Sequence, residues 1–207
     1  MKRFNNLFFG FIFGSTFPLL GFLLSLLTWF CADKTESRVL MYVIPGFIGG
    51  ILIDILYLKG WINKKYELPL WFVIGIYIFY NICVYGLFMG FPVFNLFSGI
   101  IAGYYFGIRI YYKHRSADQQ KKSINHVSIF TGFIMLLICI SSGYIALAGI
   151  GVGRDLEAML GLGFQVTRPM IWSVTVIGGL LLVLLQILVT KYSMTQTIKA
   201  YESGQRN

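Results

Sequence analysis

Six stretches of about 20 predominantly apolar residues follow one another along the chain, at residues 7–31, 39–58, 69–89, 92–112, 127–149 and 170–190. Each is long enough to cross the hydrocarbon core of a bilayer as a helix. Only 12% of the 207 residues are charged, about half the share found in soluble domains, so lipid must cover most of the outer surface. The sequence therefore predicts an all-α, polytopic integral membrane protein with six transmembrane helices, a single domain over residues 1–207 and a lipid bilayer as its main partner.

Proline marks the beginning of three of these stretches, at Pro69, Pro92 and Pro169. A proline fits the first turn of a helix, where its missing N–H leaves no hydrogen bond unmade. The connection Gly90-Phe91-Pro92 between the third and fourth stretches is very short. These two spans are therefore predicted to form an antiparallel hairpin.

The basic residues predict the orientation in the membrane. If the N-terminus is cytoplasmic, six crossings return the C-terminus to the same side, and the 17 Lys and Arg residues divide into 13 inside and 4 outside. An excess of basic residues in cytoplasmic loops is typical of membrane proteins, so we expect a multi-pass protein of the cell membrane with both termini in the cytoplasm. The net charge of +9 then needs no nucleic-acid partner. The inner residues are Lys2, Arg3, Lys59, Lys64, Lys65, Arg109, Lys113, Arg115, Lys121, Lys122, Lys191, Lys199 and Arg206, and the outer ones are Lys34, Arg38, Arg154 and Arg168.

Three polar residues are predicted to share a level in the inner half of the membrane. Asp54, Arg109 and Gln186 each lie four or five residues before a basic residue that marks the cytoplasmic boundary, which places them roughly 6 to 8 Å inside it. A carboxylate in lipid is costly alone, so Asp54 is expected to pair with Arg109. These residues either form a fixed ion pair that holds two helices together, or serve as a proton or ion relay or as a gate at the cytoplasmic end of the bundle.

A second polar level is predicted in the outer half of the membrane. Uncharged amides and hydroxyls there offer directional hydrogen bonds without a fixed charge, which suits a binding site for a small polar solute. Hydrogen bonds between helices are the alternative explanation of the same residues. The candidate solute-binding residues are Asn81, Asn95, Ser98, Tyr104, Ser141 and Ser142.

Small residues at helical spacing predict where helices approach closely. The glycine stripes are Gly10-xxx-Gly14, Gly46-xxx-Gly50 and Gly99-xxx-Gly103-xxx-Gly107, and we expect them to pack within the molecule rather than against a partner helix. Pro18 and Pro45 lie inside the first two spans, where kinks and freed backbone carbonyls are expected to line a cavity. In the outer loop, residues 154–160 are predicted to form a short amphipathic helix that is either a lid or a static interfacial element.

Enzymatic chemistry finds little support in the sequence. Both histidines, His114 and His126, belong to the polar segment between the fourth and fifth spans, so no Ser/His or Cys/His pair lies in the membrane. The three cysteines are scattered and form no metal-ligand pattern. No phosphate-binding glycine motif is present, and neither a metal nor another cofactor is expected.

The layout of about 200 residues, six helices, inner termini and an outer polar site is similar to the substrate-binding membrane subunits of energy-coupling-factor vitamin importers. This resemblance is one of architecture and covers no motif, so it assigns no residues. It implies a partner membrane or ATPase subunit. The sequence thus favours binding or transport of a small solute through an outward-facing polar cavity, with a non-catalytic membrane scaffold or assembly subunit as the alternative and an intramembrane enzyme third.

Overall fold

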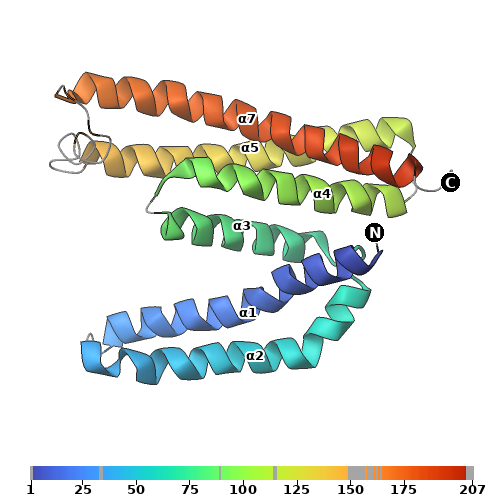
Figure 1. Ribbon diagram of the computed structural model, residues 1–207, viewed down its shortest axis with the longest axis horizontal. Coiled ribbons are helices and arrows are strands. Elements are labelled where there is room, and N and C mark those ends of the chain that lie inside the picture. Colours follow the sequence, from blue (N-terminus) through green and yellow to red (C-terminus); the bar gives the residue numbers. More distant parts are fainter. Residues whose placement is uncertain are drawn as a thin grey trace. The chain divides into compact units, whose positions relative to one another are not determined.

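The computed structural model describes residues 2–32, 35–88, 90–113, 116–148, 157, 161, 163 and 165–203, and these residues contain helices and turns but no strand. Among them, six helices are long and apolar enough to span a membrane, which confirms the predicted all-α architecture with six candidate spans. The long helices are α1 (Lys2–Ala32), α2 (Val39–Asn63), α3 (Leu70–Leu87), α4 (Leu96–Tyr112), α5 (Ala117–Ala148) and α7 (Arg168–Ser203); short 3-10 helices η1 (Glu36–Arg38) and η2 (Pro92–Asn95) precede α2 and α4 (Figure 1).

The chain divides into two compact units, Met1–Val73 and Ile74–Asn207. The first contains the α1–α2 hairpin and the beginning of α3. The second contains the rest of α3 together with α4, α5 and α7. Each unit has its own close helix–helix contacts, which are described separately.

In the first unit, α1 and α2 touch backbone to backbone. A Cβ atom on Gly21 would lie 2.1 Å from the carbonyl oxygen of Gly46, and one on Gly50 would lie 2.3 Å from the carbonyl oxygen of Phe17. These distances leave room only for hydrogen, so the Gly46-xxx-Gly50 stripe packs within the molecule, as predicted. On α1 the closest approach is at Gly21, whereas a Cβ atom on Gly14 would meet only the Leu58 side chain, at 3.1 Å.

In the second unit, the glycine stripe of α4 packs against α7. A Cβ atom on Gly103 would lie 2.7 Å from the Thr190 carbonyl oxygen, and one on Gly107 would lie 3.0 Å from that of Met194. The contacts advance in the same direction along both helices, so α4 and α7 run parallel. Nearer the C-terminal ends of α4 and α7, Met194 packs with Ile110 and Ile198 in a buried apolar cluster.

Helices α5 and α7 lie side by side in opposite directions (Figure 1). Gly132 faces Ile187 and Gly143 faces Thr175, so positions along α5 rise as those along α7 fall. The hydroxyl groups of Thr131 and Thr190 are 3.0 Å apart in this interface. Both threonines are buried, and their hydrogen bond is a polar contact between the two helices.

Two helix ends differ from the apolar spans. Helix α5 begins at Ala117 rather than near Val127, and α7 continues to Ser203 rather than ending near Thr190. Most of the predicted inner loop is therefore helical. Hydropathy marks the part of a helix that can lie in lipid, whereas the helix continues as long as its backbone hydrogen bonds do. The predicted outer-loop helix at residues 154–160 lies, apart from Glu157, outside the described residues.

Replacing Gly50 by alanine is expected to destabilise the protein by about 1 to 3 kcal/mol, because the new methyl group would overlap the Phe17 carbonyl. Gly49→Ala is the matched control, since nothing lies within 4 Å of its Cβ position and alanine favours a helix by about 0.5 to 1 kcal/mol. Thermal unfolding of the detergent-purified protein measures both effects. Equal changes in the two variants would contradict the close contact at Gly50.

Candidate functional site

Three of the predicted outer residues meet across the α3–α4 hairpin. The Nδ2 atom of Asn95 donates to the backbone oxygen of Asn81 at 2.8 Å and to its Oδ1 atom at 3.0 Å. The Ser98 hydroxyl also donates to Asn81 Oδ1, at 2.8 Å. The chain reverses through Gly90, whose φ of +83° favours glycine. This turn brings the two asparagines together, as the short connection predicted.

Tyr77 and Gln186 complete the group, which we call the amide cluster: Tyr77, Asn81, Asn95, Ser98 and Gln186. The Nε2 atom of Gln186, on α7, donates to the Tyr77 hydroxyl at 3.2 Å. The Ser98 hydroxyl lies 3.4 Å from the same oxygen. Sequence reasoning missed Tyr77, although it precedes Asn81 by four residues and so shares its helix face.

The amide cluster is buried and leaves two acceptors unused. Asn95 is 0% exposed and Gln186 is 1% exposed. Their carbonyl oxygens, Asn95 Oδ1 and Gln186 Oε1, accept no hydrogen bond from the residues that the structure describes. A buried acceptor without a donor typically costs about 1 to 3 kcal/mol, so the cluster has the capacity to bind a ligand that carries N–H or O–H donors.

Gln186 lies with residues predicted for the outer level, although it was predicted for the inner one. Its side chain faces Gly99 near the beginning of α4, whereas Arg109 lies near the end of that helix. The two positions on α4 are about 15 Å apart along its axis. The structure therefore places Gln186 beside the amide residues and not beside Arg109, and an inner gate formed by them stays a prediction. Counting from Lys191 assumed that α7 ends at the boundary, but the register of α7 is set by its packing against the α4 glycines.

The remaining outer residues lie apart from the amide cluster. The Ser141 hydroxyl donates to the Leu137 carbonyl of its own helix, on an exposed face. The Ser142 hydroxyl donates to the Gly90 carbonyl at 2.9 Å and so ties α5 to the hairpin turn. Tyr104 is hydrogen-bonded with Tyr201 of α7, further along α4 than the cluster. Whether any of these residues binds solute stays a prediction.

Asp54 and Arg109 are both buried, at 5% and 9% exposure. Asp54 belongs to the first unit and Arg109 to the second, so their pairing stays a prediction. Arg109 Nη1 donates to the Tyr105 hydroxyl at 3.4 Å. Neither carboxylate oxygen of Asp54 has a hydrogen-bond partner in the described part of the chain.

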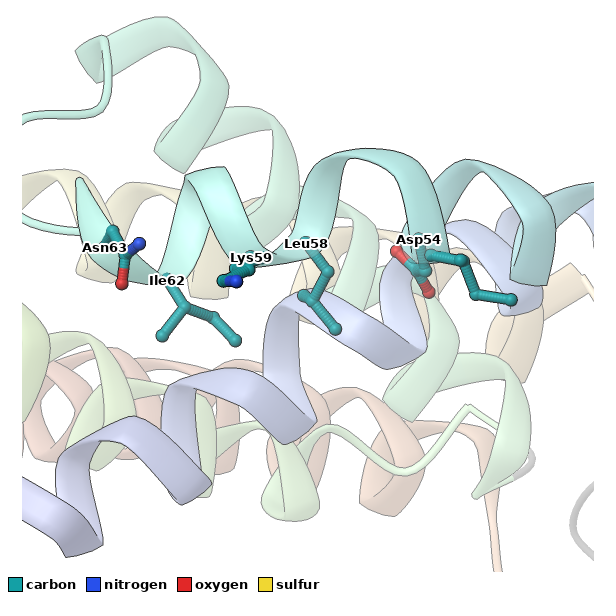
Figure 2. A pocket seen from close by; sticks show the side chains of 6 residues that line it. Asp54, Leu58, Lys59, Ile62 and Asn63 are labelled. Carbon is teal, nitrogen blue, oxygen red and sulfur yellow. The ribbon is translucent and has the colours of Figure 1, made fainter.

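Two cavities open beside these helices. One, of about 290 Å³, lies along α2; Figure 2 shows the side chains that line it, which are Asp54, Ile55, Leu58, Lys59, Ile62 and Asn63. The other, of about 430 Å³, lies between α5 and α7, and its lining includes Leu136, Cys139, Tyr144, Trp172 and Gly179. The first contains a carboxylate, whereas the second is almost entirely apolar.

No protein-family model, curated protein or solved structure matches this chain. Within the described residues, no group of three or more His, Cys, Asp or Glu side chains is placed to hold a metal ion. The candidate sites therefore stand on their own chemistry: an uncharged amide cluster in the second unit and a single buried carboxylate in the first.

Asn81→Leu is expected to destabilise the protein by about 1 to 3 kcal/mol, because Asn95 Nδ2 and the Ser98 hydroxyl each lose their bond to Asn81 Oδ1 and keep only a backbone acceptor. The control is Ser173→Ala on the exposed face of α7, where the serine hydroxyl donates to the Pro169 carbonyl of its own helix. Thermal unfolding in detergent compares the two. A loss no greater for Asn81→Leu than for Ser173→Ala would show that the cluster adds nothing to stability.

Proposed function

We propose that the protein binds a small, polar, uncharged solute at the amide cluster and moves it across the membrane. Polar side chains within transmembrane segments are rare and commonly mark substrate pathways. Here they come from two consecutive spans and from α7 and converge on one buried point. The convergence of three elements supports a common site.

The unused acceptors carry this proposal. Asn95 Oδ1 and Gln186 Oε1 are buried without donors among the described residues, and a solute with N–H or O–H groups would supply them. The Asn95 amide nitrogen already donates to two oxygens of Asn81, which fixes its carbonyl oxygen as the free acceptor. The site would therefore select a hydrogen-bond donor and reject an apolar analogue, which leaves both oxygens unpaired.

Binding at a cluster this deeply buried requires an opening. The turn at Gly90 connects the two helices that carry Asn81 and Asn95, and it is held to α5 by the Ser142 hydroxyl. We infer that the solute enters from the outer side as this turn moves away from α5. The opening would give the outward-facing cavity that solute binding needs.

A second candidate function is that of a non-catalytic membrane scaffold or assembly subunit. It is favoured by the extent of the internal bonding: Asn81, Asn95 and Ser98 bond to one another, and Asn95 and Asn81 are 0% and 2% exposed. Under this interpretation the amides only hold the hairpin together. The two functions differ in whether any solute stabilises the protein.

A thermal-shift screen of the purified protein against amino acids, nucleosides, sugars and vitamins tests solute binding. We expect at least one donor-rich compound to raise the unfolding temperature by several degrees, since a ligand that binds only the folded state stabilises it. In Gln186→Met, which lacks the unused oxygen but keeps a side chain of similar length, that shift should be lost. The unfolding temperature without ligand should change little, because removal of the unpaired acceptor offsets loss of the hydrogen bond from Nε2 to the Tyr77 hydroxyl.

Ser173→Ala controls for surface effects and should keep the full ligand-induced shift. The scaffold function predicts no shift with any compound, in the wild type or in either variant. A compound that stabilises wild type and Gln186→Met equally would bind elsewhere and would contradict the assignment to the amide cluster.

We also infer that the protein lies in the cell membrane with both termini in the cytoplasm. The support is the distribution of 13 and 4 basic residues among the 17 in the sequence, which follows the positive-inside tendency. The parallel course of α4 and α7 agrees with six crossings, in which the fourth and sixth spans run in the same direction, and the basic residues alone favour one orientation.

Cysteine labelling of intact cells tests the orientation. In a background with Cys31, Cys83 and Cys139 replaced by alanine, Thr35→Cys is expected to react with an impermeant maleimide from outside. Gln119→Cys, at an exposed position on α5, should react only after the cells are permeabilised. The reverse pattern would invert the topology.

A further inference from the structure

Asp54 lies within the face of α2 that packs against α1. This face repeats every four residues, and the neighbours of Asp54 on it are Gly50 and Leu58. Gly50 touches the backbone at Phe17 and Pro18, and Leu58 contacts Gly14. The carboxylate therefore sits between two points at which α1 and α2 are in direct contact.

This carboxylate has no hydrogen-bond donor among the described residues. Asp54 is 5% exposed, and both of its oxygens are buried without a hydrogen-bond partner. A carboxylate can only accept, so it must receive a donor, a counter-charge or a proton. Leaving it charged and unpaired in lipid would be costly. Asp54 is therefore a candidate functional residue that binds a positively charged group or a proton.

From Asn5 onward, the opposing helix offers an oxygen ligand but no cation. From Asn5 to Ala32, α1 contains no Lys, Arg or His, and its only titratable side chain is Cys31 near the far end. Pro18 lacks the N–H that would normally bond the carbonyl of Gly14, four residues earlier. Helical carbonyls point toward the C-terminus, so this oxygen points along α1 toward the turn of Phe17 and Pro18. That turn contacts Gly50, one turn before Asp54 on α2.

A cavity leads from this point to the end of α2. It has a volume of about 290 Å³ and is lined by Asp54, Leu58, Lys59 and Asn63, among others. Figure 2 shows Leu58 and Ile62 projecting on the same side of α2 as Asp54. Lys59 is exposed and is the only basic side chain in this lining. A small ion in this cavity would lie beside Asp54.

We propose that Asp54 binds a monovalent cation, either a sodium ion or a proton, with the Gly14 carbonyl as a second oxygen ligand. Carboxylate and freed carbonyl oxygens at helix interruptions are the groups that hold such ions in membrane proteins. One carboxylate balances one positive charge. A divalent ion prefers several carboxylates, and the described residues form no such group. This site lies in the first unit and does not depend on solute binding at the amide cluster.

Thermal unfolding of the full-length protein in detergent tests the proposal with two arms. In the first, NaCl replaces choline chloride at constant ionic strength, and in the second, choline chloride is fixed while the pH is lowered from 8.5 to 5.5. We expect the unfolding temperature of the wild type to rise by several degrees in the arm that supplies the occupant, because a bound cation stabilises the folded state. A sodium response identifies the ion as sodium, and a response only to acid identifies it as the proton.

Asp54→Asn should lose the response, because the amide carries no charge to balance. Asp118→Asn is the matched control: it removes an exposed carboxylate on α5 and should respond as the wild type does. If Asp54→Asn does not fold, Asp54→Glu replaces it. A shift in the sodium concentration or pH at half-response in that variant supports the site, and an unchanged midpoint overturns it.

The competing occupant is Arg109. If Arg109 balances Asp54, the wild type shows no response to sodium beyond that of Asp54→Asn, and no acid response that Asp54→Asn lacks. The stability losses of Asp54→Asn and Arg109→Gln would then be non-additive. That combination overturns the cation site. The solute screen is unaffected by either result, because it reads ligand shifts that depend on Gln186.

Discussion

Close contact between glycine-bearing helices is the interaction on which the rest of this protein depends. In lipid, apolar side chains gain little by leaving their surroundings, so helices associate through van der Waals packing and through hydrogen bonds. At Gly21, Gly46 and Gly50 the backbones of α1 and α2 touch, and at Gly103 and Gly107 α4 meets α7. Such contacts fix the register of each helix pair to a single arrangement. The register then decides which polar side chains are buried and which of them meet.

The two units bury polar groups of different chemical character. An amide both donates and accepts hydrogen bonds. Asn81 and Asn95 therefore bond to each other, and the buried amide atoms that stay unpaired are acceptors. A carboxylate accepts only, so Asp54 cannot be satisfied by its α1 and α2 neighbours, which offer glycine, proline and apolar side chains. Unpaired acceptors of amides cost a modest amount of free energy. A buried carboxylate that stays charged and unpaired costs far more.

Much of this architecture was predictable from local patterns, and the failures have a common cause. The lengths of the apolar stretches predicted the six spans, and the short turn at Gly90 predicted that Asn81 and Asn95 would meet. The level of Gln186 could not be predicted, because it depends on how far α7 slides along the α4 glycines rather than on its distance from Lys191. Ser141 and Ser142 are adjacent and so point about 100° apart on their helix; only packing decides that Ser142 reaches the hairpin. Tyr77 was missed because an aromatic residue in an apolar span looks like ordinary core.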